Sequence, residues 1–223
     1  MKNNRKAIAV VLILAVVFAM GCAGNGGKKN ADAEKEKVEV VEQPAADGKE
    51  FVDLGLPSGT LWATCNVGAD SPEEFGDYFA WGETSPKTDY NRDTYQSAGL
   101  SVLEPADDAA SVNWGDEWCI PTKEQWEELY QNTEHFWTDY NGVKCRLFVA
   151  SNQQSLFLPA ADMRWEFGNR STTVNDGHYW SSTAYEHGES YAWTYTFFAL
   201  NDNMEYLPRH RGHSVRAVRV NTK

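Results

Sequence analysis

The sequence predicts an α+β fold: a single domain with one main helix, short antiparallel strands and long loops. Three observations indicate this class. Only residues 118–130 have both the start signal and the periodicity of a substantial helix. Several short segments are rich in aromatic and β-branched residues, which are typical of strands. The stretches between these segments are long and show no sustained period, so helix and strand do not alternate as they do in parallel α/β folds.

The main helix is predicted from local chemistry. Thr122 and Gln125 have the spacing of a capping box, in which each side chain satisfies a backbone N–H left free at the helix start. Three large apolar side chains then share one face: Trp126, Leu129 and Tyr130. We expect the helix to end at Asn132 and Thr133 and to pack this face against a sheet. A shorter helix is expected to start at residues 107–110.

The strands are predicted from alternating apolar residues and from turn residues. Two hairpins are expected, at residues 51–68 around a Pro-Ser-Gly turn, and at residues 143–150 with 155–159 around an Asn-Gln turn. Three further segments are dense in aromatic or β-branched residues: 179–185, 191–200 and 214–220. Residues 84–105 are predicted to form a long loop.

The first 21 residues are predicted to be a secretory signal peptide. Positive residues precede an apolar run at 7–20, which is shorter than the roughly 18–20 residues that a membrane-spanning helix needs. Cys22 follows Ala19-Met20-Gly21, which resembles a lipobox, although Leu is usual where Ala19 stands and Met20 is bulky. Cys22 is therefore the predicted lipidation site, and its lipid would anchor the protein to a membrane. The alternative is an ordinary signal peptide with Cys22 as an incidental thiol.

Residues 22–48 are predicted to be a disordered tether that begins at the lipidated cysteine, and residues 49–221 are predicted to be the folded domain. From residue 23 to residue 49 there is no aromatic side chain, so this segment cannot bury enough apolar area to offset its chain entropy. The alternative for residues 28–41 is a short charged helix. Either structure would serve as a spacer.

The charge balance argues against some partners. Residues 1–48 hold 7 of the 20 basic and 6 of the 32 acidic side chains, which leaves 13 basic and 26 acidic side chains beyond them. A domain this acidic is a poor candidate for binding nucleic acid or anionic lipid.

Three cysteines follow Cys22, an odd number that allows one intramolecular disulfide and one free thiol. The predicted disulfide joins Cys119, just before the main helix, to Cys145 in the strand after it. No C-x-x-C pair is present in the sequence, which argues against a redox or zinc role.

Four segments resemble a known family. They include VDLGLPSGTLWATCNVGA from residue 52, WCIPTKEQWEEL from residue 118, LFLPAA from residue 156, and YWSST from residue 179 with SVRAVR from residue 214. Together they are similar to the Fibrobacter succinogenes major paralogous domain, in the same order over most of residues 51–220. The resemblance implies a C-type-lectin-like fold, related to that of the formylglycine-generating enzyme, in which the first and last strands pair. It also implies an exported bacterial protein, here an outer-membrane lipoprotein of the cell envelope. Both a domain that faces the periplasm and one that faces the cell surface are compatible with the sequence.

No catalytic site is predicted, because no nucleophile–base pair is readable. The formylglycine-generating relatives use two cysteines near the end of the domain, and residues 147–223 contain none. His210 and His213 are interpreted as a solvated pair beside Arg209 and Arg211, which would repel a divalent cation. Residues 174–176 match only the tail of a calcium-lectin motif and are more simply a turn. No cofactor or metal is therefore predicted, with calcium on the acidic loops as the alternative.

The aromatic residues suggest a binding role. The chain has nine tryptophans, more than one core of this size is expected to absorb. Four are assigned to the core: Trp62, Trp118, Trp126 and Trp180. Four aromatic residues in two predicted polar loops, at residues 136–140 and 163–167, are the predicted ligand contacts: Trp137, Tyr140, Trp165 and Phe167. We therefore expect non-catalytic binding of a protein or glycan, with a structural envelope component as the alternative and an unrecognised enzyme as a distant one.

Overall fold

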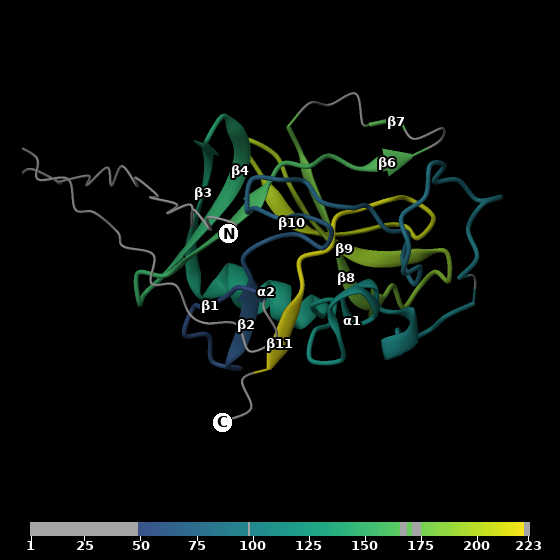
Figure 1. Cartoon of the computed structure of the whole chain (residues 1–223), viewed down its shortest axis with the longest axis horizontal. Helices are drawn as coiled ribbons and strands as arrows, with labels where there is room; N and C mark the ends of the chain where they lie inside the picture. The colour runs from purple at the N-terminus through teal and green to yellow at the C-terminus, as the bar shows by residue number, and fades with distance from the viewer. Residues whose placement is uncertain (1–48, 98, 166–168, 171–174, 221–223) are drawn as a thin grey trace, which may run out of the picture. The chain divides into compact units, whose positions relative to one another are not determined.

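The computed structural model describes residues 49–97, 99–165, 169–170 and 175–220 (Figure 1). The predicted signal peptide, Cys22 and the tether lie outside the described residues. Within them the chain has two α-helices and eleven strands, so the predicted mixture of helix and strand is confirmed. The helices are α1 (Ala109–Trp114) and α2 (Lys123–Gln131), with a 3-10 turn at Pro105–Asp107. The strands are β1 (Phe51–Asp53), β2 (Thr60–Ala63), β3 (Thr133–Tyr140), β4 (Val143–Ala150), β5 (Ser155–Pro159), β6 (Arg164–Trp165), β7 (Asn169–Arg170), β8 (Gly177–Ala184), β9 (Tyr191–Phe197), β10 (Asp202–Pro208) and β11 (Val218–Val220).

The main helix α2 begins and ends as predicted. The backbone N–H of Gln125 donates to Thr122 Oγ1 over 3.2 Å, and the backbone N–H of Thr122 donates to Gln125 Oε1 over 2.9 Å, so the capping box is formed. Trp126 and Leu129 are buried, but Tyr130 is 40% exposed and packs on the His135 ring instead. The buried face of α2 is therefore narrower than the periodicity indicated.

The two ends of the domain meet in one sheet with the order β1-β2-β11. The expected hairpin is present, with Val52 opposite Trp62. The direct pairing of first and last strands is wrong, because β2 lies between them and pairs with β11 on its other edge (Figure 1). All four residues of β2 are buried, which suits the central position.

The second sheet has the order β3-β4-β5. The hairpin of β4 and β5 was expected, with Phe148 opposite Leu156. Strand β3 was not expected, because its sequence, TEHFWTDY, is mostly polar and resembles a loop. It is nevertheless paired with β4 along all eight residues, from Thr133 opposite Ala150 to Tyr140 opposite Val143. Strand β3 therefore forms because it pairs with β4, although its own polar residues favour a loop.

The third sheet has the order β10-β9-β8, and a two-stranded sheet joins β6 to β7. Strand β9 ends at Phe197, three residues earlier than predicted, because the chain turns to form β10. Strand β10 was not expected either. It lies beside β9 from Asp202 opposite Phe197 to Pro208 opposite Tyr191. The predicted strand at 214–220 is also shorter, since only β11 (Val218–Val220) is regular.

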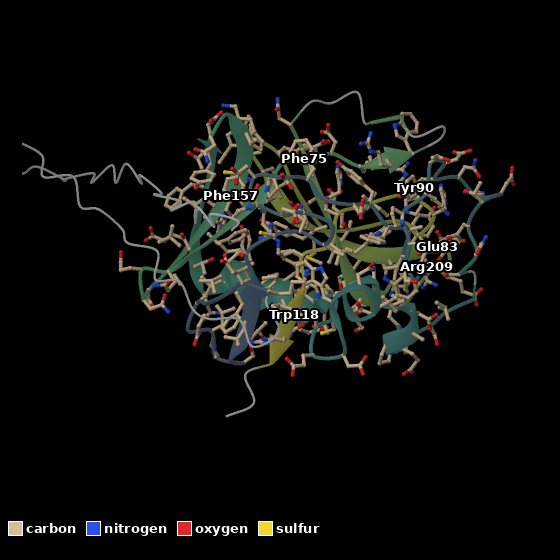
Figure 2. All side chains as sticks on the ribbon, in the orientation of Figure 1. Phe75, Glu83, Tyr90, Trp118, Phe157 and Arg209 are labelled. Carbon is tan, nitrogen blue, oxygen red and sulfur yellow. The ribbon has the colours of Figure 1, made fainter. Side chains whose placement is uncertain are left out.

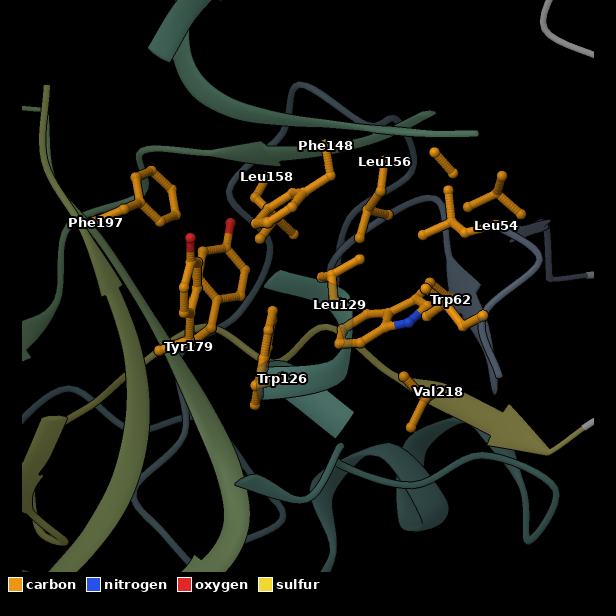
Figure 3. Packing of buried hydrophobic residues seen from close by; sticks show 14 of the residues in the cluster. Leu54, Trp62, Trp126, Leu129, Phe148, Leu156, Leu158, Tyr179, Phe197 and Val218 are labelled. Carbon is orange, nitrogen blue, oxygen red and sulfur yellow. The ribbon is translucent and has the colours of Figure 1, made fainter. Parts of the chain in front are cut away.

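The core lies where α2 meets these sheets. The Trp126 ring stacks on Tyr195, with centroids 5.0 Å apart. It also lies 4.7 Å from the Trp62 ring, and both tryptophans are shown in Figure 3. The four tryptophans assigned to the core are each at most 1% exposed, so this prediction is confirmed: Trp62, Trp118, Trp126 and Trp180. Trp81 is also fully buried.

The predicted long loop packs against the C-terminal part of the chain (Figure 2). Arg209 lies over the Trp81 ring, 4.2 Å from its centroid, and donates to the Leu100 carbonyl. Tyr95 donates its hydroxyl to the Trp81 carbonyl over 2.9 Å, and burial raises the pKa of this phenol to about 12. The described residues of this loop have no regular strand pairing, and contacts of aromatic and cationic side chains hold it against the rest of the domain instead.

Candidate functional site

Trp137 and Tyr140, two of the predicted ligand contacts, lie on strand β3 rather than in a loop. Their positions differ by three, so the side chains lie on opposite faces of the sheet. Trp137 is half-buried, packs against the core and meets Phe197 edge-on, with centroids 6.2 Å apart. Tyr140 meets Phe157 edge-on at 4.9 Å. The structure does not bring these two residues together as one surface.

Trp165, the third predicted contact, lies on β6 and is 39% exposed. It belongs to a different sheet from Trp137 and Tyr140. Phe167 lies outside the described residues. An aromatic patch that joins these positions is therefore not formed by the described side chains.

The predicted disulfide is wrong. Cys119 and Cys145 are both free thiols, as is Cys65. Cys119 bridges to Val218 of β11 through backbone hydrogen bonds, whereas Cys145 is buried in the middle of β4. The two cysteines flank α2 in sequence, but backbone pairing assigns them to different sheets. Burial raises the pKa of the Cys145 thiol to about 12, so this thiol is protonated and a poor nucleophile.

His213 is buried, which contradicts the interpretation of a solvated pair with His210. Its ring stacks on Trp180 at 3.9 Å, and its Nδ1 lies 3.2 Å from Thr194 Oγ1. A second buried histidine, His178, lies 5.4 Å away between ring centroids, and its Nε2 is 3.3 Å from Asp176 Oδ2. Burial lowers the pKa of His213 well below its ordinary value, so its imidazole is uncharged at neutral pH.

The buried histidines do not form a hydrolase triad or a metal centre within the part of the chain that the structure describes. Ser214 follows His213, but its hydroxyl has no hydrogen bond to either imidazole. No group of three or more histidine, cysteine, aspartate or glutamate side chains among the described residues is arranged to hold a metal ion.

A cluster of four aromatic residues lies at the other end of the β8–β9–β10 sheet from the turn at 198–201, and we refer to it as the aromatic cluster: Tyr185, Tyr191, Trp193 and Tyr206. The rings of Tyr185 and Tyr206 stack almost parallel, with centroids 4.0 Å apart and an interplanar angle of 11°. Trp193 meets both rings edge-on, at 5.5 and 5.9 Å. Tyr191 is also perpendicular to Tyr206, at 5.9 Å.

Strand β9 positions two of these side chains. Its alternate residues are all aromatic and share one face: Tyr191, Trp193, Tyr195 and Phe197. Tyr195 and Phe197 are buried in the core, where Tyr195 stacks on Trp126 of α2. Trp193 and Tyr191 continue the row away from the core and are only half-buried. The aromatic cluster is therefore the exposed end of a row that begins in the core.

Strand β10 and the β8–β9 loop supply the other two side chains. Tyr206 is the direct cross-strand partner of Trp193, so both rings lie on the same face. Tyr185 enters from the loop, where its N–H donates to the Tyr191 carbonyl over 3.1 Å and Gly188 donates back to the Tyr185 carbonyl. A Cβ at Gly188 would lie 3.2 Å from the Tyr191 ring and 3.4 Å from the Tyr185 ring, so glycine allows this close turn.

Charged groups flank the cluster. Lys123, the first residue of α2, places Nζ 3.9 Å from the centroid of the Trp193 ring and 3.5 Å from Glu127. The Trp193 indole N–H donates to Glu186 Oε2 over 3.1 Å. Hydrogen bonds from its own backbone N–H and from this indole hold the pKa of Glu186 below its ordinary value. Glu186 is thus an ionised acceptor beside exposed rings.

The aromatic cluster retains accessible ring surface. Tyr206 is 47% exposed although Tyr185 stacks on its ring, so part of this residue still meets solvent. Tyr185, Tyr191 and Trp193 are half-buried. Our sequence analysis missed this site, because it assigned no role to Trp193 and treated 191–200 only as a strand. The alternating aromatic residues of β9 were the available signal, since a single short helix cannot cover the whole row.

Comparisons with family models, with curated proteins and with solved structures found no match to the chain. The resemblance to the Fibrobacter succinogenes major paralogous domain therefore stays a prediction. None of the described helices is both long enough and apolar enough to cross a membrane.

Proposed function

We propose that this protein is a non-catalytic binding lipoprotein of the bacterial cell envelope and that the aromatic cluster is its contact surface. The observation that carries the proposal is the pair of stacked, solvent-facing rings of Tyr185 and Tyr206, framed by Trp193 and Tyr191. Tyrosine and tryptophan offer large, rigid contact area together with a polar tip, and they are enriched among residues that dominate binding energy.

The position of the cluster supports binding. Three of its four rings stand on β9 and β10, and β9 is anchored to the core by Tyr195 and Phe197 on the same row. The contact surface is therefore held by regular strands, and little side-chain freedom remains to be lost when a ligand binds. Its groups are phenols, an indole, a carboxylate and an ammonium, which supply contact area and hydrogen bonds.

The location and the finer fold are part of the same proposal. The signal-like residues 1–21 and the lipobox-like sequence ending at Cys22 support an outer-membrane lipoprotein with a tether. The four family-like segments support a C-type-lectin-like domain. The acidic charge of the domain argues for a protein or glycan ligand and against nucleic acid.

The proposal is tested with the double variant Tyr185→Ala/Tyr206→Ala. Binding of the purified protein to envelope material from its own source would be measured by biolayer interferometry. The matched control is Phe136→Ala, because Phe136 is also 47% exposed but lies on β3 of the β3-β4-β5 sheet and is not part of the aromatic cluster. We expect the double variant to lose at least about tenfold in affinity, as for a hot spot, and the control to bind as the unsubstituted protein does. Equal binding by all three proteins contradicts the proposal, and no binding by any of them favours a structural envelope component without a discrete ligand.

A further inference from the structure

The aromatic cluster combines a stacking surface with one ionised acceptor. Tyr206 presents the accessible part of its ring, and Tyr185 supports that ring from the other side at 4.0 Å. Trp193 Nε1 donates to Oε2 of Glu186 over 3.1 Å, and the Glu186 side chain is 58% exposed. The other oxygen, Oε1, lies 3.8 Å from Nε2 of the exposed His187, which is too far for a hydrogen bond, so Oε1 can still accept hydrogen bonds from a ligand. A flat apolar ring beside an oriented acceptor matches a ligand that has a C–H face and hydroxyl donors at its edge.

The charges around the cluster narrow the ligand further. An ionised Glu186 and an acidic domain disfavour a ligand that carries carboxylates, sulfates or phosphates. A cationic ligand that stacks on Trp193 would have to displace the protein's own Lys123, which already lies over this ring at 3.9 Å. The surface is therefore best matched by an uncharged ligand.

We propose that the aromatic cluster binds an uncharged glycan, with a sugar ring stacked on Tyr206 and its hydroxyl groups donating to Glu186. This inference rests on the proposed function and specifies the ligand class of the same surface. The stacked pair provides the apolar contact, and the edge-on rings of Trp193 and Tyr191 keep the pair from rotating. The carboxylate supplies specificity, because a charged acceptor strengthens each hydrogen bond that it receives.

The experiment uses the full-length mature protein and soluble polysaccharides of known charge. The neutral probes are β-glucan, mannan and xylan, and the anionic probes are alginate and heparin. Affinity gel electrophoresis and titration calorimetry would compare the unsubstituted protein with Tyr206→Ala, Tyr206→Phe, Glu186→Gln and the control Phe136→Ala. Circular dichroism would show that each variant is folded.

At least one neutral glycan should bind, and Tyr206→Ala should weaken it about tenfold or more. Tyr206→Phe should keep most of the affinity because it keeps the ring, and Phe136→Ala should change nothing. Glu186→Gln retains an acceptor for the Trp193 indole but removes the charge, so we expect severalfold weaker neutral binding and less discrimination against alginate.

Three results would overturn the inference: preference for the anionic probes, neutral binding that Tyr206→Ala leaves unchanged, or no glycan binding at all. Envelope material treated with periodate, which destroys glycans, or with protease then separates this inference from the proposed function. Binding that survives periodate but not protease, and that still needs Tyr185 and Tyr206, means that the ligand is a protein. In that case the proposed binding function stands and only the glycan assignment fails.

Discussion

Replacing Arg216 by methionine tests how the domain is held together. Arg216 is fully buried, and its guanidinium donates to four oxygen acceptors at 2.8–3.1 Å. Two acceptors lie in or directly after β2, the carbonyls of Ala63 and Thr64, and a third is the Phe157 carbonyl of β5. The fourth is the side-chain oxygen of Asn66, which accepts from both Nε and Nη2. One side chain therefore joins the β1-β2-β11 sheet to the β3-β4-β5 sheet.

The expected magnitude follows from the acceptors that Arg216→Met leaves behind. A buried acceptor without a partner costs about 1–3 kcal/mol, and the Asn66 side chain and the Ala63 carbonyl belong to fully buried residues. Removing the buried charge itself recovers part of this, since burial lowers the pKa of Arg216 and so disfavours its charged form. Two such acceptors cost about 2–6 kcal/mol together, and after the recovered part we expect a net loss of about 2–4 kcal/mol, a large share of the roughly 5–15 kcal/mol that stabilises a typical domain.

Urea denaturation followed by tryptophan fluorescence would measure the free energy of unfolding. Lys144→Met is the control, because Lys144 forms an exposed ion pair with Asp139 and its loss should cost less than about 1 kcal/mol. Arg216→Lys should fall between the two, since it keeps the charge but not the planar fork. A change below about 1 kcal/mol for Arg216→Met would show that the four acceptors find other partners, and the reasoning would be refuted.

Three further predictions concern other parts of the chain. Because the pKa of His213 in the folded state lies below the value of about 6.5 in the unfolded chain, its contribution to stability should be complete above that pH. Below about pH 6.5 this contribution to the free energy of unfolding should fall by up to about 1.4 kcal/mol per pH unit. His213→Gln should flatten this pH dependence in urea titrations, and an unchanged slope in the variant would contradict the prediction. Thr122→Ala removes the acceptor for the Gln125 N–H and should cost about 1 kcal/mol by thermal unfolding, whereas Thr122→Ser should cost less. Cys22→Ser should leave the unprocessed precursor in the membrane fraction, as should globomycin treatment, and normal processing of the variant in pulse-labelled cells would exclude lipidation at this residue.

Local chemistry explains which elements could be predicted. The capping box of Thr122 and Gln125 involves residues three apart, so it is readable in the sequence and is formed in the structure. The same holds for the hairpins β1–β2 and β4–β5, whose turns lie between two clear strands. Strands β3 and β10 could not be found in this way, because their polar residues form strands only by pairing with β4 and β9.

The candidate site shows the same limit. An abundance of aromatic residues is a property of composition, and it correctly suggested that some rings would reach the surface. Which rings do so depends on tertiary packing, because Trp193 is half-buried at the end of the β9 row whereas Trp137 packs against the core. Tyr185 and Tyr206 join the site from other elements, and their stacking is decided by strand register rather than by any motif.

The sequence by itself determined the helix α2, two hairpins, the four buried core tryptophans and the acidic charge of the domain. Each of these depends on near neighbours or on composition. Only the tertiary structure decided that β2 separates the first and last strands, that His213 is buried, that Cys119 and Cys145 stay apart, and that the aromatic cluster forms. These features join residues far apart in the chain, and the physical reason is that burial and cross-strand contact depend on what the rest of the fold places beside a residue.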